Sequence, residues 1–137
     1  MTKSTQKLSF DDKLIVASTN NLTCYMIGDE IFYAFFNANT HNSSEEMEFV
    51  FNAYNQQVKE KKGPLKVIIE LDEYAQLDRS AREYLEKHTT KGICEATVTK
   101  SIAQRIIVNF YFKVKSHSHP SRAFKSKEDA LKWVNTF

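Results

Sequence analysis

The sequence predicts an α/β domain with a mixed sheet flanked by about four helices, an N-terminal antiparallel meander preceding parallel β-α-β units. Residues 14–36 contain three short runs rich in β-branched and aromatic side chains, separated by turn residues. From residue 65 onward, apolar strand-like runs alternate with amphipathic helical segments in the order β-α-β-α-β-α. Only 3 Gly and 2 Pro occur in 137 residues, so we expect one domain, 1–137, without a linker.

The N-terminal third predicts an antiparallel meander of three or four strands. Leu14–Ala17 is a short apolar run, Leu22–Ile27 alternates as a half-buried strand does, and Ile31–Phe36 is crowded with aromatic side chains. Residues 18–21 and Gly28-Asp29 supply the turns between these runs. Connections this short suit antiparallel neighbours.

A helix is predicted after the meander. Ser43 or Ser44 can cap its N-terminus, and Glu46 lies at the capping-box distance from Ser43. Gly63 and Pro64 are expected to end it. Its apolar residues recur at helical spacing and predict one buried face, formed by Met47, Val50, Phe51, Tyr54 and Val58.

The next three elements read as strand, helix and strand. Val67–Leu71 is apolar except for Glu70, which is typical of a strand covered on both faces. Asp78 is a suitable N-cap for a helix that ends near Gly92, and Ile93–Thr99 alternates as a strand. The predicted buried face of this helix consists of Ala81, Tyr84, Leu85 and His88.

Residues 101–115 fit either a helix or a strand. Strand propensity is high in the second half, and a strand would place the odd-numbered residues 105–113 on one side. A helix would place four polar side chains in one row. We predict a helix because the β-α-β order requires one here. The polar row would consist of Ser101, Arg105, Asn109 and Lys113.

This same segment carries more apolar side chains than one helix face needs. The excess must be covered by the C-terminal helix, by a second copy in a symmetric dimer, or by an apolar ligand. The C-terminal helix is predicted from a Ser126 cap with Asp129 at the capping-box distance. Its expected buried stripe is Ala130, Leu131, Val134 and Phe137. The excess apolar residues are Ile102, Ile106, Ile107, Val108, Phe110, Tyr111, Phe112 and Val114.

Composition excludes several classes of protein. The net charge of +2 at pH 7 is too small to imply nucleic acid or an anionic membrane as a partner. No apolar run approaches the roughly 20 residues that span a bilayer. Residues 1–10 lack the apolar core of a signal peptide, so we expect a cytoplasmic protein. Cys24 and Cys94 lie among apolar neighbours in predicted strands, where buried reduced thiols are expected rather than a disulfide.

The sequence offers no set of residues typical of catalysis. No Ser-His-Asp, Cys-His or paired-carboxylate arrangement follows from the spacing. His117 and His119 could share a metal ion, but no carboxylate or cysteine lies near them in sequence, so a solvated loop is expected. His88 is expected to be hydrogen-bonded and partly buried. We therefore predict a protein that is not an enzyme and that holds neither metal nor cofactor.

The order of motifs in the C-terminal half resembles a known family. The motifs are Asp78-x-x-Ala81-Arg82-x-Tyr84, then Ser101-x-x-x-Arg105-Ile106-x-x-Asn109-Phe110, then Pro120-x-x-x-Phe124-x-x-x-x-x-Ala130-Leu131-x-Trp133. Over residues 65–137 this order resembles the SpoIIAA-like group of small bacterial proteins, which are related to STAS domains and share a fold with lipid-carrying CRAL-TRIO domains. The resemblance implies a mixed sheet flanked by helices, in a fold whose better-known members regulate by binding partners.

The resemblance also points to one modification site. STAS anti-sigma-factor antagonists carry a phosphorylatable serine in a pattern like Asp-Ser-Ser-Gly, and the matching stretch here reads Asp78-Arg79-Ser80-Ala81. Arg79 stands in the place of the phosphoacceptor, so the resemblance implies no intact phosphoserine switch. Ser80 remains a candidate because a phosphate there would lie near a helix N-terminus and between Arg79 and Arg82.

Four residues are predicted to bind a ligand or a partner. In a parallel α/β sheet, ligands bind beyond the carboxyl ends of the strands, where the strand order reverses. An arginine and helix amides there could hold an anion. The alternative is that the arginines have a structural role, through loop carbonyls or Glu70, Asp78 or Glu86. The four predicted residues are Arg82, Arg105, Asn109 and Phe110.

The function we predict is that of a non-enzymatic regulatory or binding module that acts through a protein partner, or through itself as a homodimer. The alternative is a carrier of a lipid or other apolar small ligand, motivated by the apolar excess in residues 102–114. Nucleic-acid binding is the least favoured reading. Residues 109–113 could stack bases only if they formed a strand, and they lack the glycine pattern of an RNA-recognition motif.

Overall fold

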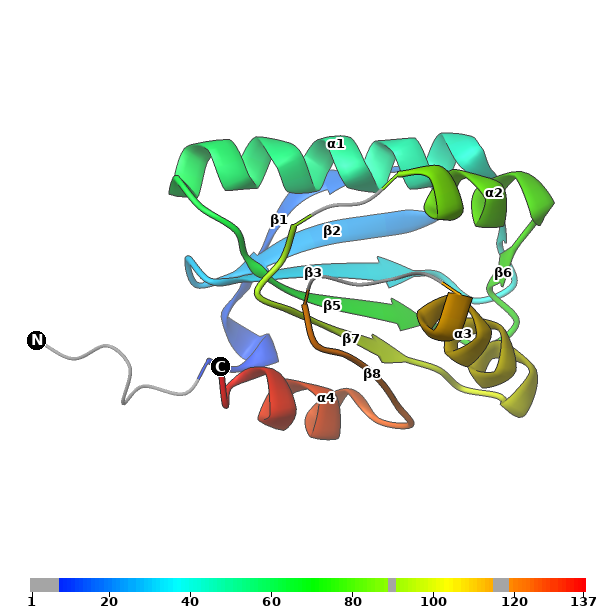
Figure 1. The fold of residues 1–137 in the computed structure, drawn as a ribbon. Coiled ribbons are helices and arrows are strands. Elements are labelled where there is room, and N and C mark those ends of the chain that lie inside the picture. The colour runs from blue at the N-terminus through cyan, green and yellow to red at the C-terminus, as the bar shows by residue number, and fades with distance from the viewer. Residues whose placement is uncertain (1–7, 89–90, 115–118) are drawn as a thin grey trace, which may run out of the picture.

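The computed structural model describes residues 8–88, 91–114 and 119–137, and the side chains of Lys113 and Val114 lie outside the described part (Figure 1). A six-stranded mixed sheet forms the centre of this part of the chain, and helices cover both of its faces. The strands of the sheet are β1 (Lys13–Ser18), β2 (Leu22–Ile27), β3 (Ile31–Phe36), β5 (Lys66–Leu71), β7 (Cys94–Val98) and β8 (Ser121–Phe124). The helices are α1 (Ser44–Lys61), α2 (Arg79–Lys87), α3 (Ile102–Val114) and α4 (Lys127–Val134).

The sheet is antiparallel at one end and parallel at the other. Its strand order is β1-β2-β3-β5-β7-β8. β1, β2 and β3 pair antiparallel, and β3, β5, β7 and β8 pair parallel. The predicted mixed sheet with a meander first is therefore confirmed. The strand order follows the chain order throughout, so the expectation of a ligand site where the order reverses is wrong.

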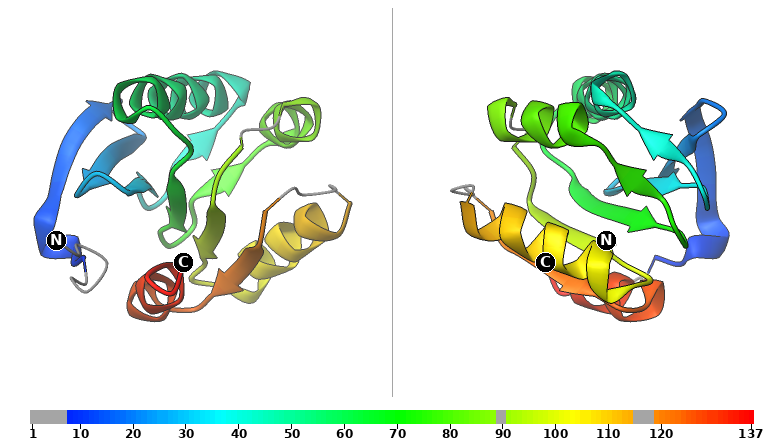
Figure 2. Two further views of the ribbon diagram at one scale, coloured as in Figure 1. Left: turned by 60° about the vertical axis from the view of Figure 1, so that its left-hand side comes forward. Right: turned by 90° about the vertical axis from the view of Figure 1, so that its right-hand side faces the viewer.

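Each face of the sheet buries its own apolar core, with α1 and α2 above the sheet and α4 below it in Figure 2. Along β3, Phe32 and Phe36 belong to the core under α1, whereas Ile31 and Tyr33 belong to the core under α4. This alternation is the period of two that a strand imposes. Val108 of α3 joins the first core, so α1, α2 and α3 all serve the same face.

The start of α1 carries the predicted capping box. The Ser43 hydroxyl accepts from the amide of Glu45, and the Glu46 carboxylate accepts from the amide of Ser43 at 2.6 Å. The helix ends at Lys61, and Lys62 adopts a left-handed conformation with φ of 63°. Gly63 then donates its amide to the carbonyl of Val58 at 3.1 Å, which closes the last turn.

The three later helices form where the sequence predicts them, and α2 and α4 differ from the prediction in detail. Residues 102–114 form a helix, as predicted. α2 ends at Lys87, earlier than expected, and His88 is exposed rather than partly buried, although its Nδ1 lies 3.0 Å from the carbonyl oxygen of Tyr84. In α4, Ser126 accepts from the Asp129 amide at 3.2 Å, and Ala130 and Val134 are buried as predicted. Leu131 is only half-buried and Phe137 is 43% exposed, so the predicted stripe is too wide.

A second, two-stranded parallel pair joins the beginnings of α1 and α2. It consists of β4 (His41–Asn42) and β6 (Gln76–Leu77). The fully buried side chain of Asn42 donates through Nδ2 to the Gln76 carbonyl at 3.1 Å and to the Thr40 hydroxyl at 3.0 Å. The sequence analysis did not predict this pair, because no periodic pattern can be recognised in strands of two residues.

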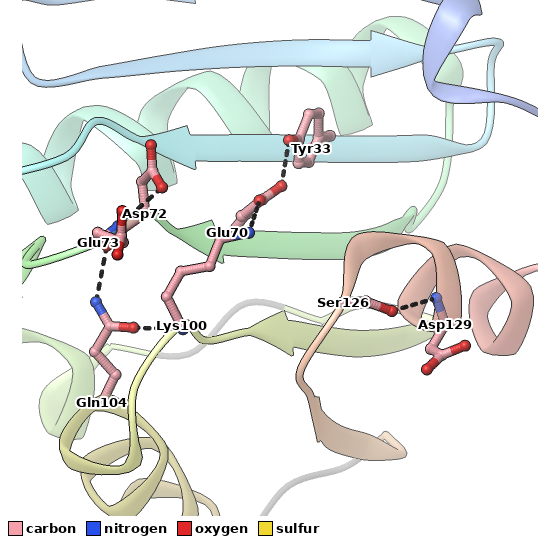
Figure 3. Close-up of polar contacts among 8 residues, drawn as sticks. All are labelled: Tyr33, Glu70, Asp72, Glu73, Lys100, Gln104, Ser126 and Asp129. Carbon is pink, nitrogen blue, oxygen red and sulfur yellow. Dashed lines mark hydrogen bonds and ion pairs between the residues drawn. The ribbon is translucent and has the colours of Figure 1, made fainter.

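A buried carboxylate connects three segments of the parallel half of the sheet (Figure 3). Glu70 of β5 is 3% exposed. Its Oε1 accepts from the Tyr33 hydroxyl of β3 at 2.6 Å, and its Oε2 lies 3.2 Å from the Lys100 Nζ, just after β7. Burial, followed by the contact with Glu70, holds the pKa of Tyr33 far above its usual value. Glu70 therefore holds the end of β7 against the middle of the sheet.

The N-terminal end of α3 is fixed by a buried glutamine. The Gln104 Nε2 donates to the Asp72 carbonyl at 2.9 Å and its Oε1 accepts from the Lys100 amide at 2.7 Å (Figure 3). The same Nε2 also donates to the Ala75 carbonyl at 3.1 Å. One side chain thus joins α3 both to the loop after β5 and to the loop from which the helix begins.

The outer strand β1 exposes its apolar side chains. Leu14 is 72% exposed and Ile15 is 66% exposed. The pairing with β2 shifts register between Ile15 and Ala17, which marks a bulge at the free edge of the sheet.

The two cysteines are free and fully buried, one in β2 and one in β7. Burial raises the pKa of Cys24 to about 12 and that of Cys94 to about 11. The prediction of two buried reduced thiols is confirmed, and neither thiol is suited to act as a nucleophile at neutral pH.

We expect Glu70→Gln to lower the free energy of unfolding by about 1–3 kcal/mol, because the Lys100 ammonium group loses its buried partner. The measurement is urea unfolding followed by the fluorescence of Trp133. The control is Glu83→Gln, which removes the exposed pair of Glu83 with Arg79 and should cost about 0.5 kcal/mol or less. Equal losses in both variants would contradict the structural role of Glu70.

Candidate functional site

An apolar cavity of about 710 Å³ lies between the sheet and the helices α1, α2 and α3. The sheet contributes Val67 and Ile69 of β5 and Phe32 of β3, α1 contributes Val50, and α2 contributes Leu85. The volume falls in the range of about 300–1,000 Å³ that is usual for small-molecule sites.

The cavity exists because α2 and α3 are held at separate places on one face of the sheet. α2 packs against α1, where the rings of Phe51 and Tyr84 meet edge to face at 5.3 Å. α3 is held by Gln104 and by buried Val108, and it lies apart from α1 and α2 in the views of Figures 1 and 2. Side chains from all three helices line the space between them.

One row of apolar side chains on α3 remains exposed. Ile102 is 68% exposed, Ile106 63% and Phe110 62%. These three residues, four apart in sequence, form what we call the α3 stripe. Of the three alternatives for covering the apolar excess, cover by the C-terminal helix is ruled out, because α4 packs on the opposite face of the sheet.

Two residues of the α3 stripe also line the cavity, namely Ile106 and Phe110. They are more than half exposed to solvent, so they stand at its mouth. Of the four predicted binding residues, the structure brings two to this cavity: Arg82 of α2 and Phe110 of α3. Arg105 and Asn109 are not among its lining residues.

Arg82 makes a contact of the kind that the structural alternative predicts, whereas Arg105 makes none among the described residues. The Arg82 Nη1 donates to the carbonyl of Leu77 at 2.7 Å, which fixes the guanidinium to the loop before α2. Arg105 is half-buried, and its Nε has no hydrogen-bond partner within the described residues. Asn109 is exposed. The suggested pairing of an arginine with Glu70 is wrong, since Tyr33 and Lys100 occupy that carboxylate.

Ser80 has a structural role at the junction of two helices. Its hydroxyl donates to the Asp78 Oδ1 at 2.7 Å and accepts from the amide of Ser44, at the start of α1, at 2.9 Å. The Ala81 amide and the Ser80 hydroxyl, both donating to the Asp78 carboxylate, lower its pKa below the usual value. A phosphate on Ser80 would lie beside this carboxylate and would break the bond to α1.

The polar residues of the cavity include a pair that the sequence analysis did not identify. The Oε1 of Glu95 on β7 lies 3.3 Å from the Nε2 of His119. The His119 side chain is 7% exposed, so its prediction as a solvated loop residue is wrong. Tyr111 of α3 lies close enough for Glu95 to raise its pKa, after the larger effect of burial. His117, the other half of the suggested metal pair, lies outside the described residues.

Glu95 did carry one signal in the sequence. It alternates with apolar residues along β7, which placed it on one face of a predicted strand. Which side chains lie beside Glu95 depends on the pairing of β7 with β5 and β8 and on the position of α3. None of these can be read from local periodicity.

Within residues 8–88, 91–114 and 119–137, no three His, Cys, Asp or Glu side chains come together in a way that could hold a metal ion. Over the same residues, no helix combines the length and the apolar character that crossing a bilayer requires.

The mixed sheet, with three helices on one face and one on the other, defines an α/β domain, and an apolar cavity lies beneath its three-helix face. The chain belongs to the family described as a domain of unknown function, DUF7793, whose model matches residues 25–137. No curated protein matches the chain.

Two solved structures are similar to the chain. One is an uncharacterized protein of the DUF3478 family with a SpoIIAA-like fold from Shewanella loihica PV-4, at 19% identity over 98% of both chains, with a TM-score of 0.53. It supports the fold and nothing further. The other, a protein with unknown function from Arthrobacter sp. FB24, is 17% identical over 89% of this chain and 98% of that chain, with a TM-score of 0.32.

We expect Ser80→Ala to lower the free energy of unfolding by about 1 kcal/mol, because the Ser44 amide loses its acceptor. Ser80→Asp should cost more, since its carboxylate faces that of Asp78 and cannot donate to it. The measurement is urea unfolding, with Ser18→Ala on exposed β1 as the control that should change little. An Asp variant no less stable than the Ala variant would favour a phosphorylation site at Ser80.

Proposed function

We propose that the protein is a non-enzymatic binding module that holds an apolar small molecule in the cavity between α1, α2 and α3. The observation that carries this proposal is the cavity itself, about 710 Å³ of space with a largely aliphatic and aromatic lining. Protein interiors are normally close-packed, with few voids larger than a water molecule. A largely apolar lining around a space of this size is typical of sites for apolar small molecules.

The mouth of the cavity supports the same proposal. Ile106 and Phe110 line the cavity while remaining 63% and 62% exposed. A ligand that entered between α2 and α3 would cover part of this surface. Removing apolar area from water contributes about 25 cal/mol per Å², so an occupied cavity is favoured over an empty one.

The absence of enzymatic activity is part of the proposal. The polar side chains that line the cavity are Arg82, Glu86, Glu95, Thr97 and His119, together with the hydroxyls of Tyr54 and Tyr111. Within the described residues, this lining holds no serine or cysteine beside His119 that would form a nucleophile and base. The two thiols of the chain lie elsewhere, fully buried and with raised pKa values.

We expect the neutral apolar probe N-phenyl-1-naphthylamine to bind with an increase in fluorescence. Ile69→Trp should weaken this binding at least about tenfold by placing an indole ring in the space that the probe occupies. Ile93→Trp is the matched control, because Ile93 is 39% exposed and does not line the cavity. Circular dichroism should show that both variants are folded. The proposal fails if the wild type does not bind the probe, or if the two variants bind it equally.

A second candidate function is the docking of an acidic protein partner on the α3 stripe. The stripe is exposed, and residues 96–127 contain no Asp or Glu. A second copy of the same helix would oppose like charges, so an acidic partner is favoured over self-association. The basic residues of this stretch are Lys100, Arg105, Lys113, Lys115, Arg122, Lys125 and Lys127.

For this second candidate we expect salt-sensitive binding of a labelled acidic amphipathic helical peptide, measured by fluorescence anisotropy. Ile106→Glu should abolish the binding, whereas Ile15→Glu, on exposed β1, should not. Light scattering tests the alternative, in which the α3 stripe binds a second copy of this chain. A wild-type dimer that Ile106→Glu dissociates would contradict the acidic partner and support self-association.

A further inference from the structure

We infer that the cavity selects an amphiphile whose polar head donates hydrogen bonds, such as an alkyl amine or alcohol, and that Glu95 accepts from this head. The inference rests on the proposed function, because it assigns the chemistry of the ligand in the same cavity. It adds the class of ligand and the residue that recognises its polar end.

One carboxylate oxygen of Glu95 has no hydrogen-bond partner among the described residues. Its Oε1 lies 3.3 Å from the Nε2 of His119, and its backbone amide donates to the Pro120 carbonyl at 2.9 Å. Within the described residues, no hydrogen bond of its Oε2 is present. The Glu95 side chain is 20% exposed and lines the cavity, so this oxygen can reach a ligand there.

The polar side chains that the sheet contributes to the cavity lie on β7. On the cavity side of β7, Glu95 and Thr97 stand opposite Val67 and Ile69 of β5 in the parallel register. The floor of the cavity is therefore apolar along β5 and polar along β7. An amphiphile fits such a floor with its chain over β5 and its polar head at β7.

The negative charge of Glu95 distinguishes between the possible polar heads of a ligand. A carboxylate bordering an apolar space repels a second carboxylate more strongly than it would in water, and it attracts a cation or a neutral donor. Burial and, after it, the charge of Glu95 raise the pKa of Tyr111, so both effects disfavour a further anion at this end of the cavity.

The competing arrangement places a fatty acid with its carboxylate at Arg82. Arg82 lines the cavity from α2, together with Glu86. The Arg82 Nη1 is already used by the Leu77 carbonyl at 2.7 Å, and the residue is exposed. A carboxylate there would also meet the like charge of Glu86, four residues later on the same helix. Both observations favour Glu95 as the recognition site.

The test uses three ligands with the same chain and different heads: dodecylamine, dodecan-1-ol and dodecanoate. Each is used below its micelle concentration to displace N-phenyl-1-naphthylamine at neutral pH. We expect the amine and the alcohol to bind at least about tenfold more tightly than the carboxylate. Glu95→Gln should reduce the preference of amine over carboxylate to about threefold or less. Glu83→Gln, which alters a carboxylate outside the cavity, should leave it unchanged.

The outcomes separate the two proposals. Equal displacement by all three ligands would overturn the inference and leave the binding function intact. Tighter binding of dodecanoate than of the other two ligands would also overturn the inference. If Arg82→Gln removed this preference, the polar head would lie at Arg82. Failure of the wild type to bind the probe or any of the three ligands would overturn the proposed function and the inference with it. The comparison of heads in the wild type does not depend on the folding of any variant.

Discussion

The buried carboxylate of Glu70 is the constraint on which the parallel half of the structure depends. A charge that is 3% exposed is tolerated only if polar partners surround it, and Tyr33 and Lys100 supply them from two other segments. Lys100 lies between β7 and α3, so satisfying Glu70 also fixes the point from which α3 leaves the sheet. Gln104 then fixes the direction of the helix by bonding to the loop after β5.

The cavity follows from how the helices on one face are attached. α2 is tied to the start of α1 through Ser80 and Ser44, and α3 is tied to the sheet through Gln104. The two attachments lie at the N-terminal ends of the helices, so a movement of either helix toward the other would strain these hydrogen bonds. The space between them is thus maintained by polar contacts at the helix ends together with the packing of Val108 and of the Phe51–Tyr84 pair.

Local signals in the sequence were sufficient for most of the fold. The capping box of Ser43 and Glu46, the Asp78 and Ser126 caps and the period-two pattern of the strands each depend on residues a few positions apart. The choice of a helix for residues 102–114 came from the order of elements and is correct. The pair β4–β6 was not predicted because it depends on contacts between residues more than thirty positions apart.

The candidate site could be predicted only in part for the same reason. The apolar excess of residues 102–114 did indicate an unusual helix, and Phe110 does stand at the cavity mouth. His119 looked like a solvated loop residue because its partner, Glu95, lies 24 positions away. Arg82 and Arg105 looked alike in sequence, yet one borders the cavity and the other does not. A charge pair between distant segments leaves no local pattern.

The bulge in β1 has a consequence for the protein in concentrated solution. A regular outer strand with exposed Leu14 and Ile15 would offer its unpaired amides and carbonyls to the same strand of another molecule. The shift between Ile15 and Ala17 interrupts that row and twists the strand locally. The irregular edge therefore disfavours edge-to-edge pairing of β1 between two molecules, the pairing from which fibrils grow.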